Sequence, residues 1–301
     1  MKNSLNSLEH LLERHFGFSD EPRRLSGGLS HEVFSLNREK IIVKIYSKEI
    51  STKRLDEEAY ALELVAKSSM INTPKLIRSN SGELRVPYNQ TLLSCFKKIE
   101  GERKYLLTEC PKLEEIYDIG KYLGKLHSEL ASSLAHTEGD RSSQILELSK
   151  GLFGVDSREV QQILKNLSQA NAPYFITHGD FQQSNLLYLG NQISGVIDFE
   201  YSTFDFRVND LAGCLSNLLS AAEERHSLDL IVKKFIDGYQ ESFGQKILPV
   251  ELDSLPDLLR LIWRVNLYWV ETKLKENRSK EITALLELYC KQTIRWLNNC
   301  T

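Results

Sequence analysis

The sequence has few cysteines and no long apolar run, and its charges nearly balance. The five cysteines are odd in number, far apart and without the paired spacing of a zinc site, so we expect reduced thiols in a cytoplasmic protein. A formal net charge of -3 argues against non-specific nucleic-acid binding, which needs a strongly basic face. The best apolar candidate, LLRLIWRVNLYWV, is interrupted by Arg260 and Arg264 and is too short to cross a bilayer. We therefore expect neither a nucleic acid nor a membrane as partner.

What is present is an ordinary globular composition, with 41% hydrophobic and 26% charged residues over a length that exceeds one average domain. The apolar pattern predicts short strands before residue 98 and mostly helices after it. The expected strands are 23–25, 32–36, 41–46, 84–86 and 92–97; the expected helices are 52–67, 113–131, 141–152, 157–168, 209–222, 227–243, 256–277 and 280–298. We expect an α+β chain with a small sheet lobe, residues 1–98, and a larger helical lobe, residues 99–301.

Two polar stretches interrupt the helical part, THGDFQQSNLL and GVIDFEYS, and they flank a hairpin signal at Gly190-Asn191. Alone, Asp180, Asn185 or Asp198 would be typical of a turn or a strand end. Together they offer the carboxylate and amide oxygens that Mg²⁺ prefers. The interval from Asp180 to Asn185 is that of a kinase catalytic loop, and Asp198 begins an Asp-Phe pair like the one that binds metal in kinases. The pattern predicts phosphoryl transfer.

A second group of candidates lies near the N-terminus. Gly27 and Gly28 stand between two predicted strands, where a backbone without side chains can approach phosphate oxygens, although such a pair is also common in plain hairpin turns. The next strand, IIVKIY, encloses Lys44 in apolar residues, which is costly for an ammonium group unless an anion meets it. Helical spacing selects Glu58 as the carboxylate partner of Lys44, the alternative being a solvated acidic face.

These motifs resemble those of the aminoglycoside phosphotransferase and choline kinase family, which includes a type of homoserine kinase. The similar segments are SGGLSHEVF, IIVKIY, YLGKLHSEL, HGDFQQSNLLY, GVIDFEYS and VNDLAGCL, in the order in which that family carries them. The resemblance implies a protein-kinase-like bilobal fold, with a small antiparallel-sheet N-lobe that has one main helix and a larger, mostly helical C-lobe. It implies ATP and Mg²⁺ as cofactors.

The resemblance also implies roles for single residues. Asp180 would be the catalytic base and Asn185 and Asp198 the magnesium ligands. The nucleotide would be bound by Gly27, Gly28, Ser30, Lys44, Glu58, and the backbone near Lys97 and Ile99. Asp210 matches an acid that supports the catalytic loop in the family, although an acid at a helix N-terminus is equally compatible.

The chain departs from the family at two places in the catalytic loop. Family members often carry His-Pro-Gly where this chain has Gln182, Gln183 and Ser184. The segment GYQESFGQKILPVELDSLPDLLRL is mildly similar to homoserine kinases, many of which carry alanine at the position of Gly179. The acceptor therefore stays open among an aminoglycoside, homoserine, a choline-like alcohol and a sugar.

We predict an ATP-dependent phosphotransferase that acts on a hydroxyl group of a small molecule, as a monomer or homodimer. Asp210 follows Asp198 by only twelve positions, which leaves little room for the platform on which protein kinases bind a peptide. The alternatives are a kinase-fold binding module without catalytic activity and, less favoured, a protein kinase.

Overall fold

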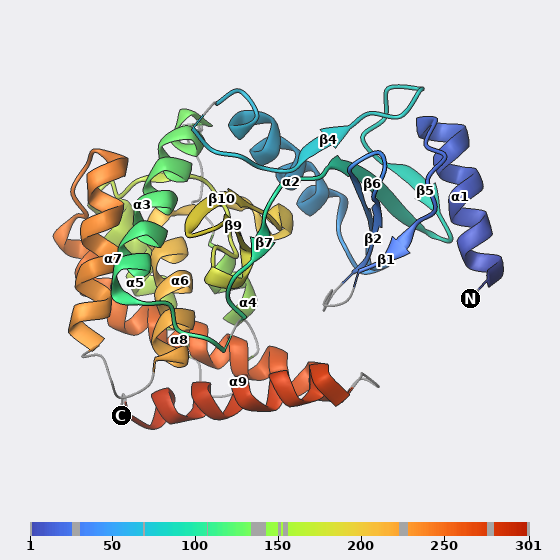
Figure 1. The fold of residues 1–301 in the computed structure, drawn as a ribbon. Coiled ribbons are helices and arrows are strands. Elements are labelled where there is room, and N and C mark those ends of the chain that lie inside the picture. Colours follow the sequence, from blue (N-terminus) through green and yellow to red (C-terminus); the bar gives the residue numbers. More distant parts are fainter. Residues whose placement is uncertain are drawn as a thin grey trace.

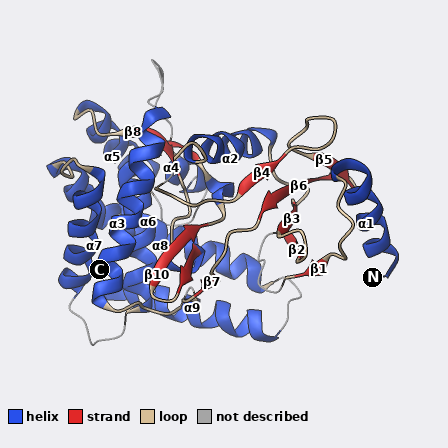
Figure 2. Ribbon diagram, turned by 45° about the horizontal axis from the view of Figure 1, so that its top comes forward, coloured by secondary structure: helices blue, strands red, loops and turns tan. Residues whose placement is uncertain are grey.

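The structure is a computed structural model. It describes residues 2–25, 31–68, 70–106, 108–133, 143–149, 152, 156–222, 228–275 and 280–299. Two lobes are visible, with the main sheet in the smaller lobe and most helices gathered in the larger one (Figures 1 and 2). Within the described residues, no helix is both long and apolar enough to span a membrane.

The smaller lobe is built on one antiparallel sheet in the order β1-β2-β3-β6-β4, with β5 paired to β6. The strands are β1 (Arg23–Arg24), β2 (Glu32–Leu36), β3 (Ile41–Ile45), β4 (Lys75–Ile77), β5 (Val86–Tyr88) and β6 (Thr91–Lys97). Successive side chains of a strand point to opposite faces, so Ile41, Val43 and Ile45 face one way and Lys44 the other. The three apolar residues join a core that also contains Leu8 and Leu12 of α1 (Lys2–Phe16). Lys44 is thereby directed to the opposite face.

Helix α2 (Thr52–Val65) is the main helix of this lobe. It begins at Ser51, whose side chain accepts a hydrogen bond from the backbone N–H of Arg54, as expected of an N-cap. Leu62 and Val65 belong to the large core that continues into the helical lobe, and Glu58 is also buried. The helix therefore presents Glu58 on the side of the sheet that carries Lys44.

The larger lobe surrounds two short pieces of sheet with helices. The helices are α3 (Leu113–Leu130), α4 (Gln144–Ser149), α5 (Ser157–Gln169), α6 (Arg207–Ala221), α7 (Leu228–Phe243), α8 (Pro249–Leu274) and α9 (Lys280–Asn299). One piece of sheet has the order β10 (Gln192–Val196), β9 (Leu186–Leu189), β7 (Glu102–Arg103), and the other pairs β11 (Thr203–Phe206) with β8 (Tyr174–Thr177). The polar stretches noted in the sequence connect these strands and lie at the edge that faces the smaller lobe (Figure 1).

The elements follow the predicted pattern, with differences at the short and buried ones. Strands β4, β7, β8 and β11 have only two to four residues each and were not predicted. Helix α8 begins at Pro249, seven residues before the predicted start, because Pro249 takes the first helical position and Pro256 is tolerated inside the helix. The boundary between residues 98 and 99 remains a prediction; β6 ends one residue earlier, at Lys97.

A close approach of α3 and α7 gives a test of the packing. A Cβ added at Gly120 of α3 would lie 2.1 Å from the carbonyl oxygen of Phe235 in α7, whereas one added at Gly213 of α6 would meet nothing within 4 Å. We expect Gly120→Ala to lower the free energy of unfolding by about 2 kcal/mol, because backbone must move. Gly213→Ala should raise it by about 0.5–1 kcal/mol, because alanine favours a helix over glycine. Urea denaturation of both variants measures this, and equal effects would contradict the packing.

Candidate active site

One ammonium group and three carboxylates form the centre of the site. The Nζ atom of Lys44 lies 3.3 Å from Oε1 of Glu58, 3.2 Å from Oδ1 of Asp198 and 3.2 Å from Oε2 of Glu200. Lys44 and Glu58 belong to the smaller lobe and the other two to the larger. Burial opposes the charge of Lys44, but the three carboxylates outweigh it and raise the pKa of Lys44 well above its ordinary value. The lysine is therefore a fixed positive charge at the junction of the lobes.

The structure brings together the predicted pair of Lys44 and Glu58. The hydroxyl of Tyr46 donates a hydrogen bond of 2.7 Å to Oε2 of Glu58, so both oxygens of this carboxylate have partners. The other acids of α2 point elsewhere: Glu57 lies near Lys53, and Glu63 near Arg78. Helical spacing thus identified the acid on the face toward the sheet.

Asp180 is held through one of its two carboxylate oxygens. Its Oδ2 accepts hydrogen bonds from the side-chain amides of Asn185, at 2.9 Å, and Gln182, at 3.3 Å. Its Oδ1 has no hydrogen bond within the part of the chain that the structure describes. Because the amide nitrogen of Asn185 donates to Asp180, the amide oxygen of Asn185 remains available to another group. Gln182, whose role the sequence left open, therefore helps to fix the orientation of Asp180.

Asp180 and Asp198 have opposite protonation tendencies. Burial, and then the negative charge of Asp198, raise the pKa of Asp180 well above its usual range. For Asp198 burial acts in the same direction, but the ion pair and hydrogen bond with Lys44 prevail and lower its pKa. Asp198 also has a left-handed backbone, with φ 70 and ψ 63, which is uncommon for a residue other than glycine and typical of functional sites.

A buried set of side chains holds the loop that carries Asp180. Asp210 accepts hydrogen bonds of 2.8 Å from the backbone N–H groups of His178 and Gly179, and it lies 3.0 Å from Nε2 of His127. His178 in turn accepts the N–H of Asp180 at Nδ1 and contacts the carbonyl of Ile197 at Nε2. Burial lowers the pKa of His178, which favours the neutral ring that these contacts need. Asp210 is therefore placed to support the loop, as the resemblance implied, and it also lies in the first turn of α6.

Gly179 has a physical requirement for glycine in this chain. Its φ is +78, and an added Cβ would lie 1.9 Å from the carbonyl oxygen of Tyr201. The alanine that many homoserine kinases carry at this position would not fit here without movement of the backbone.

Of the remaining predicted nucleotide-binding residues, the structure describes only Lys97 and Ile99. Gly27, Gly28 and Ser30 lie outside the described residues. Lys97 is exposed at the end of β6, and Ile99 is buried against Gly195 of the larger lobe. Within the described residues, neither Lys97 nor Ile99 makes a hydrogen bond or an ion pair with the Lys44 cluster, which is Lys44 with Glu58, Asp198 and Glu200.

Two residues of the cluster were missed. Glu200 follows Asp198 by two positions, and His31 precedes β2; the side chains of both are 5% exposed and contact each other. The motif GVIDFEYS contains Glu200, so an acid in this segment was visible, but its partner in the other lobe was not. Among the described residues, no group of three or more His, Cys, Asp and Glu side chains is arranged to hold a metal by itself. A metal here would need oxygens from the ligand as well.

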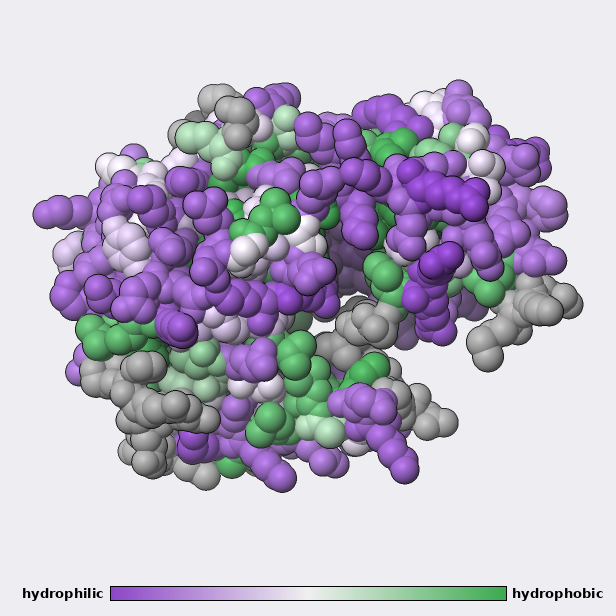
Figure 3. Space-filling model, in the orientation of Figure 1, coloured by the Kyte–Doolittle hydropathy of each residue, from purple (hydrophilic) through white to green (hydrophobic). Residues whose placement is uncertain are grey.

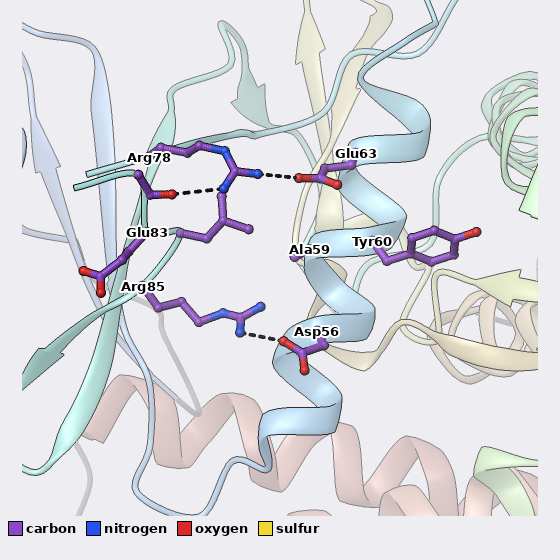
Figure 4. A pocket seen from close by; sticks show the side chains of 9 residues that line it. Asp56, Ala59, Tyr60, Glu63, Arg78, Glu83 and Arg85 are labelled. Atoms are coloured by element: carbon purple, nitrogen blue, oxygen red, sulfur yellow. Dashed lines mark hydrogen bonds and ion pairs between the residues drawn. The ribbon is translucent and has the colours of Figure 1, made fainter. Parts of the chain in front are cut away.

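An open pocket of about 430 Å³ lies on another side of α2 and is a poor candidate for the chemistry. Its charged side chains pair with one another: Arg78 with Glu63, and Arg85 with Asp56 (Figure 4). None of the residues of the Lys44 cluster lines it. The surface is hollowed between the two lobes (Figure 3), and Lys44 of the smaller lobe lies 3.2 Å from Asp198 of the larger one.

Comparison with known proteins matches residues 21–244 to the phosphotransferase enzyme family. Homoserine kinase of Bradyrhizobium sp. (strain ORS 278) is 24% identical over 258 residues, which cover 78% of this chain and 75% of that protein. Homoserine kinase of Bartonella henselae is 34% identical over 89 residues, which cover 29% of this chain and 27% of that protein.

Two solved structures share the fold at low sequence identity. An amicoumacin kinase in complex with AMP-PNP and Ca²⁺ has a TM-score of 0.69 at 17% identity and covers 96% of this chain and 93% of its own. A microcompartment-associated aminopropanol kinase has a TM-score of 0.68 at 16% identity and covers 98% of both chains. These similarities confirm the expected kinase-like bilobal fold. Because the family match extends over well more than half of the sequence, this chain belongs to the phosphotransferase enzyme family.

Proposed function

We propose that this protein transfers the γ-phosphoryl group of ATP to a hydroxyl group of a small molecule. The observation that carries the proposal is the meeting of Lys44 with Asp198 at 3.2 Å across the lobes, beside a loop in which Asn185 orients Asp180. Phosphoryl transfer depends mainly on positioning and charge stabilisation, and these groups supply both.

The chemistry of the donor groups fits Mg²⁺. Asp198, Glu200 and Glu58 bring three carboxyl groups around one ammonium, and the charge of Asp198 disfavours ionisation of the nearby Asp180. A divalent cation would relieve that repulsion. Mg²⁺ typically takes one or two carboxylates together with phosphate oxygens and water, which suits a site without an all-protein cage. We assign Asp198 and the amide oxygen of Asn185 as its ligands; when bound, the ion would neutralise charge on the phosphates.

Asp180 is proposed to receive the acceptor hydroxyl. Its Oδ2 is already engaged by Asn185 and Gln182, so Oδ1 is the atom available to accept the hydroxyl hydrogen and aim its oxygen at the phosphorus. The acceptor oxygen would form its bond to the γ-phosphorus as the bond to the β–γ bridging oxygen breaks and ADP leaves, and the hydroxyl proton would pass to Oδ1 of Asp180.

The remaining predicted residues are proposed to hold the nucleotide. Lys44 would bind the phosphates, with Glu58 keeping its Nζ in place. The backbone of Gly27 and Gly28 and the hydroxyl of Ser30 would cover the phosphates, and the backbone at Lys97 and Ile99 would meet the adenine. These assignments rest on the family motif and on the placement of Lys44 at the junction of the lobes.

The acceptor is proposed to be a small alcohol that carries an amino group, with homoserine as the first candidate. One protein named homoserine kinase matches 78% of this chain, and one structural neighbour is named an aminopropanol kinase. The segment after Asp198 passes directly through a short 3₁₀ helix and β11 into α6, which leaves no long platform for a peptide. A cytoplasmic location agrees with the free cysteines at 95, 110, 214 and 290.

Removal of single site groups tests the assignment. We expect Asp180→Asn to lower kcat by at least about 10²-fold, because an amide cannot take the hydroxyl proton, with the affinity for Mg·ATP changed little. Asp198→Asn should instead weaken the binding of Mg·ATP. The measurements are ADP release and nucleotide titration, and Asp237→Asn on the exposed face of α7 is the matched control. Full turnover by Asp180→Asn would refute the assignment.

An ADP-release screen identifies the acceptor. Homoserine, aminopropanol, ethanolamine, choline, aminoglycosides and hexosamines are compared at equal concentration. The proposal expects the highest kcat/KM with an amino alcohol. Faster turnover with a neutral sugar would contradict the acceptor class, labelled polypeptide in a protein extract would indicate a protein kinase, and nucleotide binding without turnover on any acceptor would favour a binding module.

A further inference from the structure

His31 has polar contacts at both ring nitrogens although its side chain is only 5% exposed. The backbone N–H of Ser47 donates a hydrogen bond of 2.9 Å to Nδ1, and Nε2 contacts the carboxylate of Glu200. The ring also meets the ring of Tyr46 edge-on, with centroids 5.5 Å apart. The residue thus connects the start of β2 to the segment just after Asp198 in the other lobe.

The contacts fix which nitrogen carries the proton. Because Nδ1 accepts the N–H of Ser47, it has no hydrogen of its own, so the ring carries its hydrogen on Nε2, the atom that lies against the carboxylate of Glu200. Glu200 consequently has two partners, the ring of His31 on one side and Lys44 at 3.2 Å on the other.

This second partner matters because Lys44 is shared. Its ammonium group contacts Glu58, Asp198 and Glu200 at the same time, so a nucleotide phosphate must compete with these three carboxylates for Lys44. A buried carboxylate that would lose its only partner holds on to that partner strongly, since an unsatisfied buried charge is costly. With His31 as a donor, Glu200 stays satisfied when Lys44 turns toward a phosphate.

We propose that His31 is a positioning residue of the nucleotide site: by donating to Glu200 it allows Lys44 to exchange that carboxylate for a phosphate. The inference rests on the proposed function, because it assumes that Lys44 binds a nucleotide phosphate. In this role His31 acts on Lys44 through Glu200 and does not itself contact the ligand. Its side chain links the two lobes, because it contacts Ser47 in one and Glu200 in the other.

Substitutions at His31 separate this role from packing. His31→Leu keeps an apolar body against Tyr46 and removes the donor, whereas His31→Gln keeps an N–H that can reach Glu200. We expect His31→Leu to weaken binding of a fluorescent ATP analogue with Mg²⁺ about tenfold, about 1.4 kcal/mol, and to raise KM for ATP more than KM for the acceptor. His31→Gln should recover most of the affinity. The control is His10→Leu on the exposed face of α1.

The outcomes distinguish the two proposals. Absence of nucleotide binding by the unaltered protein would overturn the proposed function itself. Binding by that protein with equal affinity in His31→Leu and the control would overturn only the role of His31, as would a loss shared equally by the Leu and Gln variants. If His31→Leu does not fold, ¹⁵N NMR of the unaltered protein decides: the proposal requires the hydrogen of His31 on Nε2, and a hydrogen on Nδ1 would overturn it.

Discussion

The structure depends on one ammonium group that is buried between two lobes and surrounded by acids. Lys44 is only 8% exposed, and its charge is stable there only because Glu58, Asp198 and Glu200 lie within 3.3 Å of the ammonium group. These partners come from a helix of one lobe and from a short segment of the other, so the cluster forms only when both lobes are folded and docked. Each buried charge is stabilised by the opposite charges around it. Removal of one of them would leave a neighbouring buried charge without its partner and would destabilise the cluster.

The supporting elements can be understood as a frame around this interaction. The alternation of IIVKI turns three apolar side chains toward α1 and leaves Lys44 on the side of α2. In the larger lobe, Asp210 and His178 tie the catalytic loop to α6 and to the end of β10, so that Asp180 and Asp198 keep their separation. The two carboxyl groups then differ in pKa because only one of them meets Lys44.

Much of this frame could be predicted from local sequence. Three local patterns were visible in the sequence. They are a lysine inside an apolar strand, an acid at helical spacing from apolar residues, and an Asp-x₄-Asn interval next to a hairpin. The contact of His31 with Glu200 could not be found in this way, since 169 positions separate them and neither residue is unusual in its own segment. The short strands β7 and β11 were not predicted for a similar reason, because they are defined by the strands with which they pair rather than by their own residues. The start of α8 was misplaced because Pro256 is a poor guide inside a long helix.

Departures from the family pattern concentrate in the catalytic loop and have local physical reasons. Gly179 is required by the approach of the Tyr201 carbonyl, and Gln182 supplies an amide donor to Asp180. Both features lie beside Asp180, so the departures from the family pattern change the immediate surroundings of this carboxylate.

The central claim is that this cluster binds the metal and phosphates of a nucleotide, and a crystal structure with Mg²⁺ and a non-hydrolysable ATP analogue tests it most directly. The account predicts Mg²⁺ at about 2.0–2.1 Å from oxygens of both Asn185 and Asp198, with Nζ of Lys44 in contact with a phosphate oxygen. Metal bound away from these two side chains, or phosphates that lie apart from Lys44, would contradict it.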